Sequence, residues 1–265
     1  MHVCKSERPK TKELSLRAEK GFTLIELSIV IVIIGLIVAG VVGGQALVNQ
    51  AKLRGLISDI HKYELAINTF KLEYDGLPGD FSRASDYGIG TSGNGDRQIA
   101  NGNSISRHED SHLLAQLTNA GLYEGPYAED IWYIIGATMP KLNYNPLVSF
   151  HPHYMGATKV ASNGHNGVGA QGLYQDYTGH AIMIGKSVAP IGMQGRLWDG
   201  FASVKDAVSM DNKMDDGEPG LGKLLVTGGQ GTGACTDKQI SEALPVAFDF
   251  SDTTSRCRFF YKLGL

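Results

Sequence analysis

A run of 27 residues at positions 22–48 is apolar apart from a few polar side chains, and it limits the folds open to this chain more than any other feature. Between residues 27 and 42 no side chain is charged, and only Ser28 is polar. About 20 apolar residues in a helix span the hydrocarbon core of a bilayer. The run therefore predicts a single helix that crosses a membrane.

The charges that flank this run predict its orientation. Residues 1–21 hold six basic and three acidic side chains, and the rest of the chain carries a formal net charge of −6. Basic flanks stay on the cytoplasmic side of a membrane, so the remainder is expected to face outward, into the periplasm. A head this acidic argues against sequence-independent binding to nucleic-acid phosphates.

Two other kinds of N-terminal segment share part of this pattern. The apolar stretch of a secretory signal peptide is usually only about 7–15 residues long, shorter than the run here. An uncleaved signal anchor fits the length and the basic flank but leaves Glu26 unexplained. An ionisable group costs about 2.5–3.5 kcal/mol at the centre of a bilayer, so Glu26 calls for a partner even near the inner end.

The segment KGFTLIELSIVIVIIGLIV, residues 20–38, resembles the processing and methylation signature of type IV prepilins and type II secretion pseudopilins. In that family a membrane peptidase cuts after the glycine and methylates the new N-terminal residue. The resemblance implies a cut between Gly21 and Phe22, N-methylation of Phe22, and a role for Glu26 in assembly. It covers about the first fifth of the chain.

The resemblance also implies a set of partners. A pilin-like subunit assembles through its N-terminal helix with copies of itself and with other pilins or pseudopilins, and it meets the prepilin peptidase and an inner-membrane assembly platform. Cleavage would create an ammonium group at Phe22, which Glu26 of the same chain or of a neighbour can neutralise. Opposite charges attract strongly where the dielectric is low.

The helical pattern continues beyond the membrane segment. Apolar side chains recur every three or four residues and mark one helix face, at Leu53, Leu56, Ile57, Ile60, Ala66, Ile67, Phe70 and Tyr74. One helix of about 80 Å is expected, and Gly76 and Pro78 should end it. We therefore divide the chain into a leader at residues 1–21, a long helix at 22–75 and a head at 76–265.

Gly43 and Gly44 interrupt the apolar run where many pilins carry a proline. Each glycine costs a helix about 1 kcal/mol relative to alanine. The pair can mark a stretch that extends in a filament, or it can let a neighbouring helix approach closely.

The head reads as an α+β fold rich in loops. GLPGD at 76–80 and a Gly/Asn/Asp-rich stretch at 91–103 predict tight turns, and residues 109–120 predict a helix. This order of motifs also resembles a subset of larger pilin-like proteins. Five short segments are of β type, at residues 131–135, 180–184, 224–226, 246–250 and 257–261. Pilin-like heads pack an antiparallel sheet on the long helix, and these segments fit that arrangement.

Two cysteines remain once the leader with Cys4 is removed. Cys235 and Cys257 are expected to form a disulfide in an oxidising periplasm, as in the C-terminal loop of many type IV pilins; the alternative is a pair of buried thiols. Closing such a loop stabilises a fold by roughly 3 kcal/mol in the chain-entropy account.

Acidic residues gather in DNKMDDGEPG, residues 211–220. Several carboxylates around a glycine turn suit Ca²⁺, which would be held by Asp211, Asp215, Asp216 and Glu218, although the spacing is not that of an EF-hand. The alternative is a solvated acidic turn. His151 and His153 lie on one side of an extended segment, but no zinc-type spacing accompanies them.

The sequence thus favours a structural subunit of a type II secretion pseudopilus or a type IV pilus. No motif singles out a catalytic group, so an enzyme is not expected, and no cofactor is required. The alternative function is a binding module, either an adhesin carried on a pilus or a DNA-uptake subunit, with Tyr- and Gly-rich loops as its surface.

Overall fold

The computed structural model describes residues 21–99, 109–129, 133–155, 179–187, 197, 199–228, 235–237, 246–251, 254 and 257–265. Within these ranges the elements follow in the order α1 (Leu24–Tyr74), α2 (Glu109–Asn119), β1 (Val148–Met155), β2 (Gly179–Lys186), α3 (Val204–Met214), β3 (Leu224–Gly228) and β4 (Cys257–Leu263). The chain divides into two compact units, Met1–Val48 and Asn49–Leu265. That division falls inside α1, whereas our sequence-based division follows the end of the helix.

The long N-terminal helix is confirmed, and its two halves differ in burial. Its buried side chains all lie beyond Val48 and recur at helical spacing: Leu53, Leu56, Ile60, Tyr63, Ala66, Ile67 and Phe70. Tyr63 was not among the expected core positions, yet it is fully buried between Phe150 and Tyr123. The helix ends where Asp75 takes a left-handed φ of 53°, directly before Gly76.

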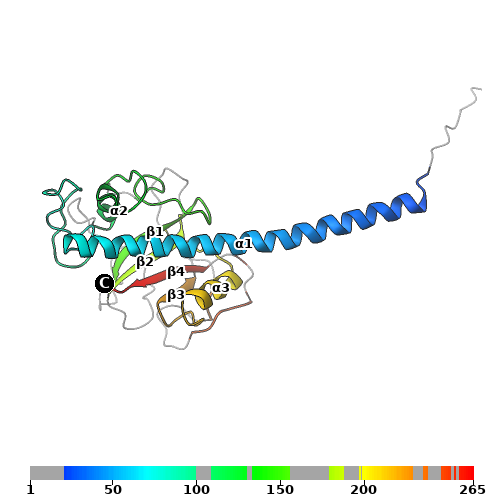
Figure 1. Cartoon of the computed structure of the whole chain (residues 1–265). Helices are drawn as coiled ribbons and strands as arrows, with labels where there is room; N and C mark the ends of the chain where they lie inside the picture. The colour runs from blue at the N-terminus through cyan, green and yellow to red at the C-terminus, as the bar shows by residue number, and fades with distance from the viewer. Residues whose placement is uncertain are drawn as a thin grey trace, which may run out of the picture. The chain divides into compact units, whose positions relative to one another are not determined.

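The head contains an antiparallel sheet of four strands in the order β1-β2-β4-β3 (Figure 1). The C-terminal strand β4 lies in the interior of the sheet and pairs with a neighbour on each side. Leu263 lies opposite His180 of β2, and Tyr261 lies opposite Leu224 of β3. Among the described strands, β1 pairs only with β2 and lies at the edge of the sheet. The predicted α+β layout, a long helix packed on an antiparallel sheet, is therefore confirmed.

Alternation along the strands gives the sheet two apolar faces, because successive side chains point to opposite sides. In β4, Phe259 and Tyr261 join the core that contains the C-terminal half of α1. Phe260 joins a smaller core on the other face, with Met183 and Leu225 as neighbours. Figure 1 shows the four strands beside the C-terminal half of α1.

Two predicted strands are wrong. Ile135 forms only an isolated bridge with Met139, and residues 131–132 lie outside the described part of the chain. Residues 246–250 form no strand either, and Phe248 makes a single bridge with Thr236. Both segments are short, and an apolar run of that length does not distinguish a strand from a packed loop.

The sequence analysis did not predict two elements, the strand β1 and the helix α3. The segment at 148–155 contains Pro152, which counts against a strand in the interior of a sheet, but β1 is an edge strand and tolerates it. The helix α3 carries few large apolar side chains, so its period is weak in the sequence. Its start is defined by Ser203, whose hydroxyl accepts a hydrogen bond from the backbone N–H of Asp206 at 3.2 Å.

Candidate functional site

The residues at the expected processing site precede α1 and lie open to solvent. Gly21 and Phe22 are not helical, and the Phe22 side chain is 89% exposed. An accessible, non-helical backbone is what a protease needs in its substrate, because a helix would have to unwind before cleavage.

Thr23 and Glu26 form a capping box at the start of α1. The Glu26 carboxylate accepts hydrogen bonds from the backbone N–H of Thr23 at 2.9 Å and from its hydroxyl at 2.7 Å. In return, the Thr23 hydroxyl accepts from the backbone N–H of Glu26 at 3.3 Å. This reciprocal pattern satisfies backbone donors that the helix itself leaves unpaired. Glu26 is thus fixed over the helix N-terminus, beside the residue that cleavage would expose.

The N-terminal unit carries its apolar side chains on its outside. From residue 21 to residue 48 every side chain is exposed except that of Ser28, which is half-buried. The helix is long and apolar enough to cross a membrane by length and composition. A helix that is apolar all round requires an apolar environment, either lipid or neighbouring helices. Gly43 and Gly44 lie within this helix, and Cβ atoms added there would contact no other described residue.

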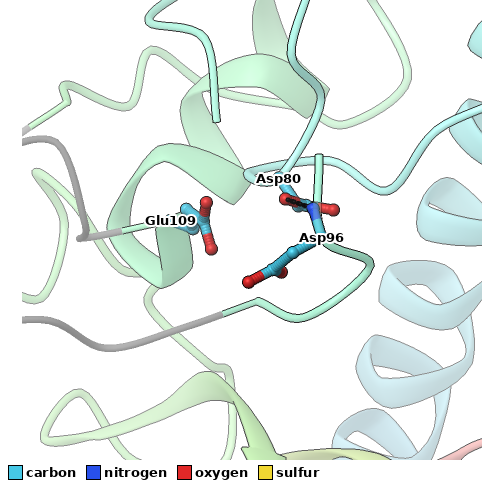
Figure 2. Close-up of side chains that lie close together, drawn as sticks. All are labelled: Asp80, Asp96 and Glu109. Atoms are coloured by element: carbon cyan, nitrogen blue, oxygen red, sulfur yellow. Dashed lines mark hydrogen bonds between the residues drawn. The ribbon is translucent and has the colours of Figure 1, made fainter. Parts of the chain in front are cut away.

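In the head, a first group of acidic residues joins two loops to a helix. Asp80, Asp96 and Glu109 each bring a carboxylate oxygen within 4.8 Å of the others (Figure 2). Asp80 is the last residue of the PGD turn (78–80), Asp96 belongs to the loop around GNGD (93–96), called the GNGD loop below, and Glu109 begins α2. The sequence analysis identified both loops as turns but did not predict that they meet.

The carboxylates of this first group accept hydrogen bonds from backbone N–H groups. Asp80, which is 3% exposed, accepts hydrogen bonds from the N–H groups of residues 95, 96 and 97 at 2.7–3.1 Å. Glu109 accepts from the N–H of Asn94 at 3.0 Å. Burial raises the pKa of Asp80 above its usual value, and the N–H groups of Arg97 and Gly95 act against that rise. The group therefore serves as an anchor for the GNGD loop.

The glycine of the PGD turn makes this anchor possible. Gly79 has a φ of 90°, and a Cβ there would collide with the backbone carbonyl of Glu109. Its N–H donates to the side chain of Gln116 at 2.7 Å, and Gln116 in turn donates to the carbonyl of Thr91 at 2.7 Å. The loop thus lies against α2 through backbone contacts that only glycine permits.

A second acidic group lies at the end of α3 and contains three of the four residues predicted to bind calcium. Asp211, Asp215 and Asp216 have carboxylate oxygens within 4.8 Å of one another. Glu218 is exposed and lies outside this group, with its N–H donating to Asp216 at 2.8 Å. Asp215 caps α3 and accepts hydrogen bonds from the N–H groups of Lys223 and Leu224.

Asp211 differs from the other members of its group. The residue is completely buried, and neither carboxylate oxygen has a hydrogen-bond partner in the described part of the chain. Burial, followed by the negative charges of Asp216, Asp215 and Glu218, raises the pKa of Asp211 to about 7. Nothing in the sequence distinguishes this aspartate from its neighbours, because its burial depends on the packing of α3.

The histidines considered for zinc take part in a buried polar network. His151 Nε2 lies 3.0 Å from Asp110 Oδ2, to which the hydroxyl of Tyr133 also donates at 2.6 Å. The His153 side chain lies outside the described part of the chain. Among the described residues, the groups of three or more potential metal ligands consist of carboxylates, so the zinc interpretation gains no support.

Cys235 and Cys257 form a disulfide across a sequence separation of 22 residues. Cys257 begins β4 and is buried in the main core, so the bond ties the loop at residue 235 to the sheet.

Comparison with known proteins gives one finding. Residues 16–42 match the family model of the prokaryotic N-terminal methylation motif, and the chain matches no curated protein and no solved structure at a significant level. The matched residues contain Gly21, Phe22, the capping box and most of the exposed apolar helix. Proteins with this motif are processed by prepilin peptidase and assemble into filaments as structural, non-enzymatic subunits. The chain therefore carries the type IV pilin and pseudopilin signature at its N-terminus, ahead of an α+β head of pilin-like layout.

Proposed function

We propose that this protein is a structural subunit of a type II secretion pseudopilus or a type IV pilus. Prepilin peptidase removes residues 1–21 and methylates Phe22. The subunit waits in the inner membrane with its head in the periplasm, and an assembly platform then moves it into a filament of its own copies and of other pilins or pseudopilins. The observation that carries the proposal is the exposed apolar half of α1, directly preceded by a processing motif.

The physical argument starts from the apolar side chains of the N-terminal unit. Full burial of one Leu, Ile or Val side chain is worth about 1.5–3 kcal/mol relative to water, so this surface cannot remain in water. Lipid can cover it before assembly, and the same surface of neighbouring subunits can cover it afterwards. A single segment thus serves as membrane anchor and as assembly surface.

Glu26 gives the assembly its electrostatic specificity in this proposal. Its carboxylate is held at the helix N-terminus by Thr23, about one turn from the ammonium group that cleavage creates on Phe22. A carboxylate and an ammonium group both lose hydration when helices pack together, and each is costly if left unpaired. Pairing between subunits would therefore favour one axial register of the helices.

Mass spectrometry of the N-terminal peptide tests the proposal and separates its two forms. N-methylated Phe22 that is abundant in filaments sheared from the cell surface would identify a pilin subunit. Processed Phe22 confined to the membrane fraction would favour a pseudopilin. A chain that still begins at Met1 in both fractions would contradict the proposal.

An isosteric variant tests the role of Glu26. We expect Glu26→Gln to enter the membrane and to be processed, but to be depleted from the filament fraction by at least about tenfold, the effect of 1.4 kcal/mol lost at one contact. Glu73→Gln is the matched control, since Glu73 is an exposed glutamate near the end of the same helix. Equal depletion of both variants, or of neither, would remove Glu26 from the assembly mechanism.

A further inference from the structure

The half of α1 that belongs to the head leaves two leucines uncovered. Leu65 is 67% exposed and Leu72 is 87% exposed, whereas Leu53 and Leu56 of the same half are fully buried. Residues seven positions apart lie on one side of a helix, so the two exposed leucines form one apolar strip. Apolar side chains that gather on one face, unlike those scattered singly, indicate an interaction surface.

The exposed charges of the same half are all of one sign. Among residues 49–72, the exposed members of the Asp, Glu, Lys and Arg set are Lys52, Arg54, Lys62 and Lys71. The two acidic residues of this stretch, Asp59 and Glu64, are half-buried, and Glu64 is paired with Lys223. This side of α1 is therefore basic, although the chain beyond residue 21 is acidic overall.

The helix patch, as we call it, consists of Arg54, Lys62, Leu65 and Leu72. Lys62 lies about one turn before Leu65, and Arg54 lies five turns before Leu72, so both basic side chains border the leucine strip. Two copies of this patch repel each other, because like charges that meet at an interface are unfavourable. A partner that fits it must offer an apolar centre with acidic neighbours.

The turn that follows α3 has this complementary character. Leu221 is 40% exposed there, and its N–H donates to the carbonyl of Glu218 at 3.1 Å. Asp216 and Glu218 are both exposed. Asp211 and Asp215 bring carboxylate oxygens within 4.8 Å of that of Asp216, which adds to the negative charge of the turn. We call Asp216, Glu218 and Leu221 the turn patch.

We propose that, in the filament, the helix patch of one copy of this chain binds the turn patch of a neighbouring copy. Leu221 of one copy packs on Leu65 of the other, and the carboxylates of Asp216 and Glu218 pair with Lys62. This inference rests on the proposed function and adds a contact between heads to the packing of the N-terminal helices.

The geometry of such a contact suits a filament. The helix patch and the turn patch are different surfaces of one head, so each copy can bind one neighbour through its helix patch and another through its turn patch. Contacts of this head-to-tail kind generate open helical assemblies when the rotation between copies does not close a ring, whereas a self-complementary patch stops at a dimer.

Cysteine cross-linking in filaments tests the contact directly. The processed chain offers no other free thiol, because Cys235 and Cys257 are bonded and Cys4 is removed with residues 1–21. Cells that express a Leu65→Cys copy together with a Glu218→Cys copy should yield disulfide-linked dimers in the filament fraction. Either copy alone should stay monomeric. Glu124→Cys, at an exposed glutamate elsewhere in the head, is the matched control and should not replace Glu218→Cys.

Charge reversal tests the same contact through assembly. Lys62→Glu and Glu218→Lys should each lower the amount of the chain in filaments at least about tenfold, while the amount in the membrane stays unchanged. A chain that carries both changes should return to within about twofold of the wild type, because opposite charges face each other again. Lys141→Glu, at an exposed lysine of the head, is the control and should assemble as the wild type does.

The outcomes separate this inference from the proposed function. Filaments that contain the chain but lack the cross-link between positions 65 and 218, or lack the rescue by double reversal, would overturn the inference alone. A dimer formed by Leu65→Cys by itself would also overturn it, since the contact would then be self-complementary. So would a cross-link to a different protein, since the partner would not be a second copy. A chain that is unprocessed and absent from filaments would overturn the proposed function itself.

Discussion

The two acidic groups of the head contain similar residues, but their carboxylates differ in hydrogen bonding. In the first, Asp80 accepts three backbone hydrogen bonds and Glu109 accepts another, so the carboxylates organise a loop. In the second, Asp211 is equally buried but has no hydrogen-bond partner among the described residues. A group of carboxylates is therefore not informative by itself. The donors around each oxygen decide whether the carboxylate anchors a loop or is buried without a hydrogen-bond partner among the described residues.

The difference has a structural cause. The GNGD loop exposes a series of backbone N–H groups that no strand or helix uses, and Asp80 satisfies them. Asp211 lies inside a helix, where the backbone N–H groups are already paired with carbonyls four residues earlier. A helical aspartate that faces the protein interior can gain a partner only from another element or from an ion.

The largest effect that would sharpen this comparison is expected at Asp80. Asp80→Ala should lower the free energy of unfolding by about 3 kcal/mol, because three backbone N–H groups lose a charged acceptor. Chemical denaturation of the processed chain in micelles measures this loss. Asp86→Ala, at an exposed position of the same loop region, should change stability by less than about 0.5 kcal/mol. A neutral result at Asp80 would mean that water replaces the acceptor without penalty.

Asp215 belongs to the second acidic group, but its carboxylate accepts backbone hydrogen bonds as Asp80 does in the first group. Its removal should therefore destabilise the fold. Asp215→Ala removes the acceptor for two backbone N–H groups at the start of β3, and we expect a loss of about 2 kcal/mol when calcium is absent. Hydrogen exchange at the N–H groups of Lys223 and Leu224 would locate the effect. Unchanged protection there would show that the strand holds these groups in place without Asp215.

Substitution of Asp211 should change the free energy of unfolding in the opposite direction when calcium is removed with EDTA. At pH 8, where its carboxylate is largely ionised, Asp211→Asn should raise the free energy of unfolding by about 1 kcal/mol, because it removes a buried charge. Denaturant unfolding in EDTA measures this gain. If the variant were destabilised as strongly as Asp215→Ala, the contrast between a hydrogen-bonded aspartate and one without a hydrogen-bond partner among the described residues would fail.

The smallest effect is a dependence of stability on pH at the loop that the first acidic group anchors. His180 accepts a hydrogen bond from the N–H of Ile99 at 3.1 Å, at the end of the GNGD loop. Burial, assisted by the charge of Lys71, lowers the pKa of His180 to about 4. The unfolded chain takes up a proton below about pH 6.5 and the folded chain does not, so this residue reduces stability as the pH falls from 6.5 towards 4.

Thermal unfolding across that range checks the prediction. His180→Gln retains an acceptor for Ile99 but does not titrate, so its stability should fall less on acidification than that of the wild type. Parallel profiles for wild type and His180→Gln would exclude His180 as the titrating group.

Most of the N-terminal unit could be predicted from the sequence. The apolar run, the glycine before Phe22 and the spacing of Glu26 are local features, and the helix follows from composition and period alone. In the head, the core strands at 180–184, 224–226 and 257–261 were also predictable, because each is a short segment made mostly of apolar or aromatic residues. The disulfide followed from the two cysteines that lie outside residues 1–21.

The remaining features depend on contacts that no local pattern encodes. β1 exists because its N–H and C=O groups pair with β2, and its place at the edge tolerates Pro152. The first acidic group joins residues separated by up to 29 positions, and the second acquires its character from the burial of Asp211. The sequence determined the membrane helix and its processing motif, since hydrophobicity and helical period are local properties. Only the tertiary structure decided which carboxylates were satisfied, because hydrogen-bond donors and burial come from distant parts of the chain.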